Sequence, residues 1–193
     1  MDVLETIKSR RSVREFLPSE VPWKDLELIL DMARYAPSAG NAQPWKFLVV
    51  GDEENKAKLR EAIKEFPGAR MDEMTLTEEE KRERREGFNQ FVEQIFMAPA
   101  LIFFLLYARR HPELAAYDGA LAVQNMMLAA HALGYGISFQ TMIFPKELVK
   151  DHLSIPDDYK FMCAVPLGRP ATRPEMPQKK ELATFIWEER FPD

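Results

Sequence analysis

Ala36-Pro-Ser-Ala-Gly-Asn-Ala-Gln-Pro-Trp-Lys-Phe47 is the stretch from which we interpret the rest of the chain. Neither a helix nor a strand continues easily between Pro37 and Pro44, so this stretch predicts a stiff loop that joins a helix to a strand. Its side chains offer hydroxyl and amide groups without charge, and Gly40 lets the backbone approach a ligand closely. The loop suits a flat ligand with polar edges, although an ordinary turn with satisfied amides also explains its composition.

The composition indicates one compact domain over residues 1–193. The chain is 46% hydrophobic and has a formal net charge of -5. This charge argues against a general nucleic-acid binder, because phosphate backbones attract proteins with a basic surplus. The single cysteine, Cys163, excludes an internal disulfide framework and a multi-cysteine metal site. We therefore expect a cytoplasmic protein with Cys163 in its core.

No segment predicts export or a membrane span. The first eight residues are charged and amphipathic, whereas a signal peptide would be apolar there. The longest apolar run, residues 97–108, contains Pro99 and is shorter than the roughly 20 residues that cross a bilayer. We expect it to form a buried strand.

Hydrophobic spacing and turn residues predict alternating helices and strands. A first helix follows Asp2, which is expected to form a capping box with Glu5, and a second follows Pro22. A third helix is capped by Asp52. The expected strands are 47–50, which we expect to be fully buried, 100–107, 137–143 and 161–167, and the later helices are 114–133 and 145–153.

Residues 68–97 form a candidate lid. Their first half is dense in mixed charge, which is typical of a solvated helical face. Their second half carries aromatic and aliphatic residues at helical spacing, so it must bury one side. We expect this side to pack in the core rather than to contact a ligand.

A basic cluster follows the first helix. Arg10, Arg11 and Arg14 lie within five residues and are interleaved with Ser12. Cations are favourable at the negative end of a helix, which is one explanation of the cluster. The other is an anion clamp for a phosphate monoester, because guanidinium groups match phosphate oxygens. The residues alone leave both explanations open.

Residues 169–193 read as an extended C-terminal arm. They are rich in proline and charge before they end in aromatic residues such as Phe185 and Trp187. A tail with these residues is not expected to be fully solvated, so we expect it to pack on the body of the chain or on a partner subunit.

The sequence lacks the usual catalytic motifs. Its histidines, His111, His131 and His152, do not show metal-ligand spacing, and we predict no metal. Hydrolase, phosphotransferase and Rossmann fingerprints are absent. Cys163 lies in an apolar strand without a neighbouring histidine, which does not suit a nucleophile. An anion clamp and an amide loop without acid-base groups indicate that a bound cofactor carries the chemistry.

Four motifs resemble those of the nitroreductase-like FMN flavoproteins, in the same order and over nearly the whole chain. They are Arg10-Arg-Ser-Val-Arg14, Ala36 to Trp45, Asp118-Gly-Ala-Leu-Ala-Val-Gln-Asn125 with Leu133-Gly-Tyr-Gly136, and Pro166-Leu-Gly168. The resemblance implies an α+β fold in which helices flank a mixed sheet. It also implies an intertwined homodimer that binds FMN tightly at each subunit interface.

The resemblance further implies a role for each motif. Arg10 would hold the FMN phosphate, Ser12 would bond along the phosphate and ribityl chain, and Arg14 would lie near the pyrimidine side of the flavin. Arg11 would contribute its backbone. The other subunit would contribute Pro37, Ser38, Ala39 and Asn41. The strand past the flavin edge would contain Ile137, Ser138, Phe139 and Gln140. A last basic contact would come from Lys179 or Lys180, between which the sequence does not decide.

This family passes hydride from NAD(P)H through FMN to an oxidised acceptor, so the resemblance implies a small nitroaromatic, quinone or related acceptor for this chain. Some relatives of the same fold remove halogen from aromatic substrates or cleave the flavin itself. A non-catalytic flavin-binding protein is a third reading. No catalytic protein acid or base is required for the hydride transfer.

Overall fold

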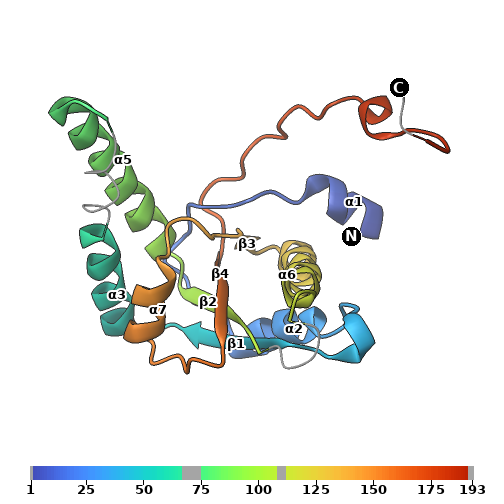
Figure 1. Cartoon of the computed structure of the whole chain (residues 1–193), viewed down its shortest axis with the longest axis horizontal. Helices are drawn as coiled ribbons and strands as arrows, with labels where there is room; N and C mark the ends of the chain where they lie inside the picture. The colour runs from blue at the N-terminus through green and yellow to red at the C-terminus, as the bar shows by residue number, and fades with distance from the viewer. Residues whose placement is uncertain (1, 67–74, 108–111, 191–193) are drawn as a thin grey trace.

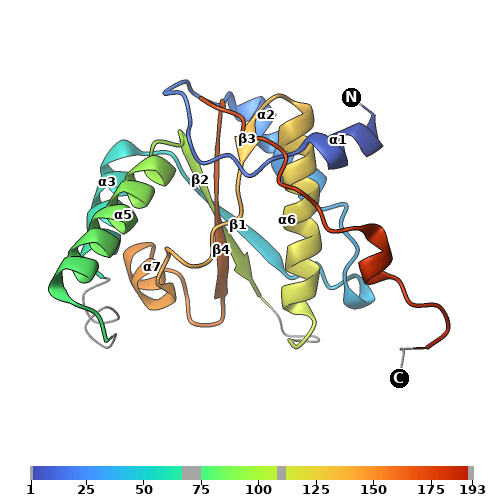
Figure 2. The same cartoon turned by 90° about the horizontal axis from the view of Figure 1, so that it is seen from above.

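A four-stranded antiparallel sheet forms the centre of the fold (Figures 1 and 2). The computed structural model describes residues 2–66, 75–107 and 112–190. The strands are β1 (Trp45–Val50), β2 (Ala100–Leu106), β3 (Gly136–Ile137) and β4 (Lys160–Gly168), in the order β1-β2-β4-β3. Among the described residues, the only parallel pairing is an isolated bridge between Ser12 and Ile137. The expected α+β class is confirmed.

Helices cover both faces of this sheet. One layer contains α2 (Trp23–Ala33) and α6 (Ala115–Ala132), and the opposite layer contains α3 (Glu53–Glu65), α5 (Glu78–Phe96) and α7 (Lys146–His152) (Figure 2). Neighbouring residues of β2 pack against opposite layers, because successive side chains of a strand point to opposite faces of the sheet. Phe104 packs in the core on the α2 and α6 side, and Phe103 packs in the core on the other side.

Several predicted elements are confirmed in detail. Helix α2 buries Leu26, Ile29 and Ala33, which share one face at helical spacing. Strand β2 is buried along its whole length. The Asp52 carboxylate accepts a hydrogen bond of 2.8 Å from the Asn55 backbone and so caps α3.

The expected capping box at Asp2 was wrong. Helix α1 (Val3–Ser9) begins after Asp2, but the Asp2 carboxylate makes no capping bond. The Asp2 carbonyl instead accepts bonds from the Thr6 backbone and hydroxyl, at 2.9 and 2.8 Å. Thr6 is buried, and its two bonds to the Asp2 carbonyl fix this first turn through the backbone.

Two strand predictions were also wrong. Residues 47–49 are only partly buried, because β1 is an edge strand of the sheet as described. The expected strand 137–143 pairs regularly only over Gly136–Ile137. Beyond it the chain leaves the ladder and returns once, at the bridge between Gln140 and Ala164.

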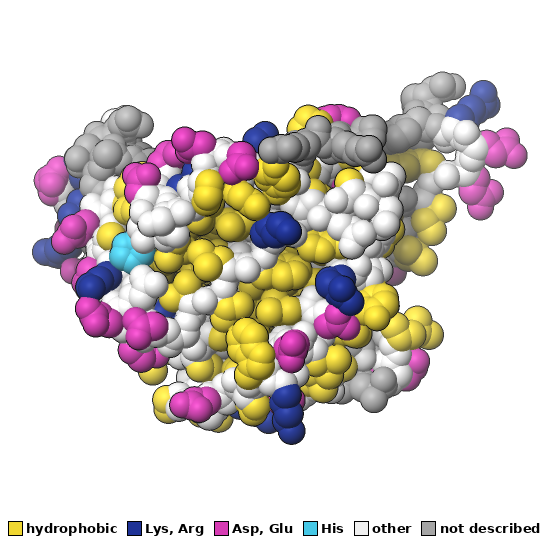
Figure 3. Space-filling model, turned by 90° about the horizontal axis from the view of Figure 1, so that it is seen from below, with side chains coloured by type: hydrophobic (Ala, Val, Ile, Leu, Met, Phe, Trp, Pro, Cys, Tyr) yellow, Lys and Arg dark blue, Asp and Glu magenta, His cyan; other side chains and the backbone are white. Residues whose placement is uncertain are grey.

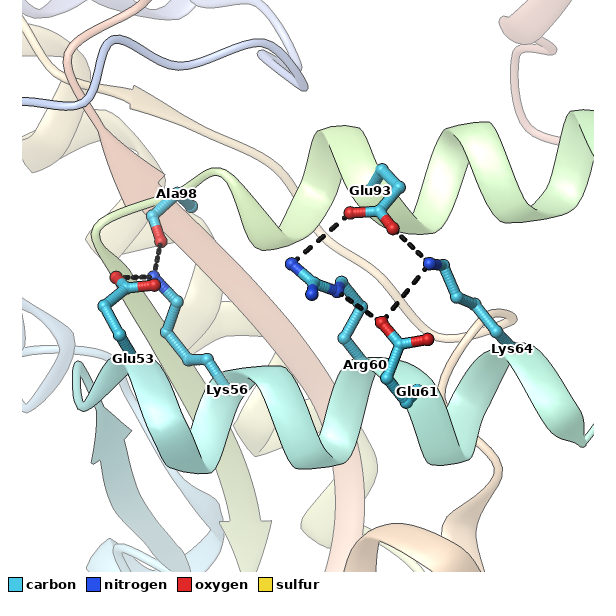
Figure 4. A network of polar contacts seen from close by, with 7 residues as sticks. All are labelled: Glu53, Lys56, Arg60, Glu61, Lys64, Glu93 and Ala98. Atoms are coloured by element: carbon cyan, nitrogen blue, oxygen red, sulfur yellow. Dashed lines mark hydrogen bonds and ion pairs between the residues drawn. The ribbon is translucent and has the colours of Figure 1, made fainter.

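Ion pairs hold α5 against α3 (Figure 4). Glu93 of α5 bonds to Lys64 and lies 3.4 Å from Arg60 of α3. The Lys64 pKa is raised, mainly by its hydrogen bond to Glu93. The described part of the candidate lid is therefore a long helix whose second half is attached to the body, while residues 68–74 lie outside the described residues.

The C-terminal arm extends away from the body (Figures 1 and 2). Its 3-10 turn, η2 (Leu182–Phe185), and residues 186–190 are exposed, including Phe185 at 62% and Trp187 at 51%. The arm thus does not bury its aromatic residues on its own chain. Hydrophobic side chains also gather in the middle of one face of the body (Figure 3). Among the described residues, no helix has both the length and the hydrophobicity to cross a membrane.

Candidate functional site

The segment that contains the predicted anion clamp lies beside β3. The Val13 backbone donates a hydrogen bond of 3.0 Å to the Ile137 carbonyl, next to the bridge from Ser12 to Ile137. Gly136 permits this approach, since a Cβ atom there would lie 2.6 Å from Val13 Cγ1. The pairing places residues 10–14 alongside residues 137–140, two stretches that the resemblance assigns to the same cofactor.

Three arginines gather where α1 and α6 end. We call Arg10, Arg11 and Arg173 the arginine cluster, because all three lower the pKa of His131 near the end of α6. In the described part of the chain, none of them forms an ion pair with a carboxylate. Burial and the neighbouring Arg11 charge lower the pKa of Arg10. Like charges held together without acidic partners form a site for an anion.

Arg10 provides an unfilled donor in this cluster. Its Nη1 atom is buried and has no hydrogen-bond partner among the described residues. Arg11 also has a buried, unpaired Nε, although its Nη1 donates to the carbonyls of Lys8 and Arg10 at 2.9 and 2.7 Å. A buried donor without an acceptor is costly, so an anion at this position would satisfy it.

A cavity of about 860 Å³ opens beside the same segment. Its walls include Arg14, Phe139 and Gln140 together with the aromatic side chains of Phe88 and Phe91 from α5. The described lining residues include cations but no carboxylate. The cavity therefore suits a flat, electron-rich or anionic group, and the aromatic side of the candidate lid forms one of its walls.

The loop formed by residues 36–47 lies at the other end of α6. The Ala39 backbone donates to both carboxylate oxygens of Asp118, at 3.2 and 3.3 Å. Asp118 and His131 are separated by 131 - 118 = 13 residues of α6, which is about 20 Å along a helix. The loop and the arginine cluster of one chain are thus at opposite ends of the same helix.

This loop combines left-handed backbone angles with internal hydrogen bonds. Gly40, Asn41 and Gln43 all have positive φ angles, of 56°, 55° and 46°. The Gln43 backbone donates to Ser38 Oγ, and its side chain donates to Asn41 Oδ1, both at 3.1 Å. Left-handed non-glycine residues are uncommon and persist where surrounding bonds hold them, which is frequent at functional sites.

The structure brings some predicted residues together and leaves others apart. Ser12 meets Ile137, and Arg14 shares the cavity with Phe139 and Gln140, whose side chain bonds to buried Ser138 at 2.9 Å. The residues that lie away from this group are Pro37, Ser38, Ala39 and Asn41 on the loop, and Lys179 and Lys180 on the exposed arm.

Sequence reasoning missed Arg173 and His131 as parts of the site. Arg173 Nη1 lies 3.3 Å from His131 Nδ1, and its Nη2 donates to the Gly134 carbonyl at 3.1 Å. The sequence shows the basic character of the arm, but it carries no local signal that pairs Arg173 with a histidine 42 residues earlier.

Comparison with known proteins adds the family. A sequence model described as the Nitroreductase family matches residues 7–169. The chain belongs to the nitroreductase family. This match includes the first arginine motif, the loop, α6 and β4, so the resemblance inferred from the sequence is confirmed.

Individual members of the nitroreductase family agree with this assignment. A relative from Methanothermobacter thermautotrophicus with the provisional name NADH dehydrogenase/NAD(P)H nitroreductase is 31% identical over 180 residues, 90% of this chain and 80% of its own length. An iodotyrosine deiodinase from Thermotoga neapolitana is 27% identical over 182 residues, 92% of this chain and 94% of its own.

A solved structure supports the same fold. It is a provisional nitroreductase from Desulfovibrio desulfuricans in complex with FMN, 26% identical, with a TM-score of 0.75. The similarity covers 100% of this chain and 99% of that chain. The family thus includes members named for different reactions, and the substrate must be argued from this chain's own residues.

Proposed function

We propose that this chain is an FMN-dependent oxidoreductase that passes hydride from NAD(P)H to a nitroaromatic, quinone or related small acceptor. The observation that carries the proposal is the buried, unpaired Nη1 atom of Arg10 within the arginine cluster. The FMN complex of a family member and the NAD(P)H nitroreductase name of another support the choice of cofactor and electron donor.

The residues present fit the phosphate end of FMN. A phosphate monoester carries negative charge that balances the arginine cluster. Its oxygens can accept a hydrogen bond from Arg10 Nη1. Arg10 and Arg14 belong to one segment, so at most about 14 Å of extended backbone separates them. A single ligand with a phosphate at one end and a flat ring at the other would thus contact both the arginine cluster and the cavity.

The cavity residues fit the ring end. The exposed Arg14 guanidinium is bonded through Nη1 to the Ser12 carbonyl at 3.4 Å, which keeps it beside the cavity. Its charge would stabilise negative charge on the pyrimidine side of the ring, an effect that grows where water is excluded. Phe88 and Phe91 offer apolar walls for the ring. Bound FMN would supply the hydride chemistry, because flavins accept and donate hydride.

A homodimer would complete the site. The loop at Asp118 is too far along α6 to join the cluster at His131 of its own chain. A second copy, related by a two-fold axis, would bring its loop to this chain's cavity and receive this chain's loop in return. The exposed aromatic residues of the C-terminal arm support an extensive interface between such copies.

An absorption spectrum and a turnover assay test the proposed function. The purified protein should show flavin absorption in the visible blue, release FMN on denaturation, and oxidise NADH or NADPH when a quinone such as menadione is added. Protein that neither retains nor takes up FMN would contradict the cofactor. Protein that holds FMN but oxidises neither nicotinamide would contradict the reaction.

Reductive dehalogenation is the second candidate, favoured by the deiodinase relative. The 31% identical relative named as an NAD(P)H nitroreductase favours the first reaction. Halide release from 3-iodotyrosine with dithionite as reductant distinguishes the two reactions. We expect none, and rapid release would favour the second candidate.

A further inference from the structure

The neighbours of His131 determine which of its ring nitrogens carries the proton. The Ser9 hydroxyl donates its single hydrogen to the Glu5 carbonyl at 2.7 Å. Ser9 Oγ lies 2.8 Å from His131 Nε2 and must accept a hydrogen there. The proton of the neutral ring is therefore on Nε2, and Nδ1 keeps its lone pair.

This lone pair points to Arg173. Arg173 Nη1 lies 3.3 Å from His131 Nδ1. A guanidinium nitrogen can only donate a hydrogen bond, so His131 Nδ1 must be the acceptor. A proton on His131 Nδ1 would place its N–H group against an N–H group of Arg173 Nη1. Burial and the charges of Arg173, Arg10 and Arg11 all lower the pKa of His131, so the ring stays neutral and accepting.

Arg173 lies on the C-terminal arm, so the bond to His131 is needed to hold its guanidinium group in place. It is exposed, and the chain beyond it leaves the body (Figure 1). Its described bonds are those to His131 Nδ1 and to the Gly134 carbonyl. An arginine has five N–H groups, so these two bonds fix the guanidinium and leave others directed elsewhere.

We propose that His131 is a positioning residue that holds Arg173 of the arm beside Arg10 and Arg11, so that three guanidinium groups converge on the phosphate of FMN. This inference rests on the proposed function. It assigns His131 no contact with the reacting atoms. Its effect is on cofactor choice: the arrangement favours FMN over riboflavin, which has the same ring and no phosphate.

Three substitutions of His131 separate positioning from packing. His131→Asn retains an acceptor, Oδ1, close to the place of Nδ1. His131→Gln retains a donor toward Ser9 but places no acceptor at Nδ1, and His131→Leu retains neither. The readout is the dissociation constant of the apoprotein for FMN and for riboflavin, from quenching of flavin fluorescence. Arg173→Gln and the double variant with His131→Leu complete the set.

We expect parent protein to bind FMN more tightly than riboflavin. His131→Leu and His131→Gln should each weaken FMN binding about tenfold, as for one charge-assisted bond, with riboflavin binding unchanged. His131→Asn should stay within about threefold of the parent. The double variant should lose no more than Arg173→Gln alone, because His131 acts through Arg173.

Equal loss of FMN and riboflavin affinity in His131→Gln would overturn the inference, since it would show a general packing defect. Additive losses in the double variant would do the same. If His131→Leu fails to fold, His131→Gln and Arg173→Gln carry the comparison. Parent protein that binds neither flavin would instead contradict the proposed function, so the two failures are distinguishable.

Discussion

Gly136 and Val13 pack so closely that no side chain fits between them. A Cβ atom built on Gly136 would lie 2.6 Å from Val13 Cγ1 and 2.8 Å from Val13 Cβ. Since both contacts involve atoms near the Val13 backbone, flexible side-chain movement cannot relieve them. Val13 lies between Ser12 and Arg14, so this contact sets where residues 12–14 lie against β3.

Gly136→Ala should therefore disturb both stability and cofactor binding. Overpacking of this kind costs about 1–3 kcal/mol, and the shift of residues 12–14 should weaken FMN retention. Gly87→Ala is the matched control, because its Cβ meets no atom within 4 Å and a helix interior favours alanine. Urea unfolding and FMN titration measure the two effects. Equal stabilities for the two variants would show that the contact relaxes freely.

Arg10→Ala should lower FMN affinity much more than it lowers the turnover of fully loaded enzyme. A charge-assisted bond to phosphate contributes about 1.5–3 kcal/mol, roughly a ten- to hundredfold change in affinity. Arg34→Ala is the control, since Arg34 forms an exposed ion pair with Asp31 at the end of α2. Titration of the apoprotein with FMN measures the change. Unchanged affinity would remove Arg10 from the phosphate site.

Lys56→Met should destabilise the fold, because it removes the hydrogen-bond donor to the backbone carbonyl of Ala98, just after α5. Lys56 is 3% exposed and donates to the Ala98 carbonyl at 2.8 Å (Figure 4). An unsatisfied buried carbonyl costs about 1–3 kcal/mol. Lys58→Met removes an exposed pair with Glu54 and should cost less than about 1 kcal/mol. Similar unfolding free energies for both variants would contradict the role of Lys56.

Cys163 should be inert in the folded protein. Burial raises the pKa of its thiol to about 12, so the folded protein keeps a proton that the unfolded chain loses near pH 8.5. Stability from this group is thus present at neutral pH and falls as the pH rises from about 9 to 12. Alkylation with iodoacetamide at pH 8.5 should be on the order of a hundredfold or more slower than in urea-unfolded chain. Comparable rates would contradict the burial.

Local spacing predicted the parts of the fold that depend on local chemistry. The buried face of α2, with Leu26 and Ile29, follows from the helical repeat, and the cap at Asp52 follows from one side chain three residues before Asn55. The position of a strand at the edge of a sheet does not follow from local spacing. Residues 47–49 are apolar enough for a central strand, and only the sheet order shows that one side of β1 has no neighbouring strand in the described part of the chain.

The same limit applies to the site. The family motifs predict site roles for Arg10 to Arg14 and for Phe139 to Gln140. The partnership of Arg173 with His131 joins segments far apart in sequence and has no periodic signature. The resemblance predicts a basic contact from Lys179 or Lys180, which stays a prediction, and the arginine held in the cluster is nearer the start of the arm. Hydrogen-bond geometry, not composition, distinguishes these cations.

The central claim is that one site combines the arginine cluster of one chain with the loop of another. Arg10→Glu would disable the cluster, and Ser38→Trp would block the loop. Each homodimer should be inactive. A mixed dimer would contain one site in which both parts are unaltered.

The decisive measurement is NAD(P)H oxidation with menadione by the two variants before and after they are unfolded and refolded together with FMN. Random pairing makes about half of the dimers mixed, and each restores one of two sites, so about one quarter of parental activity should return. No recovery, despite mixed dimers confirmed by mass spectrometry, would contradict the account and show that both parts serve the site of their own chain.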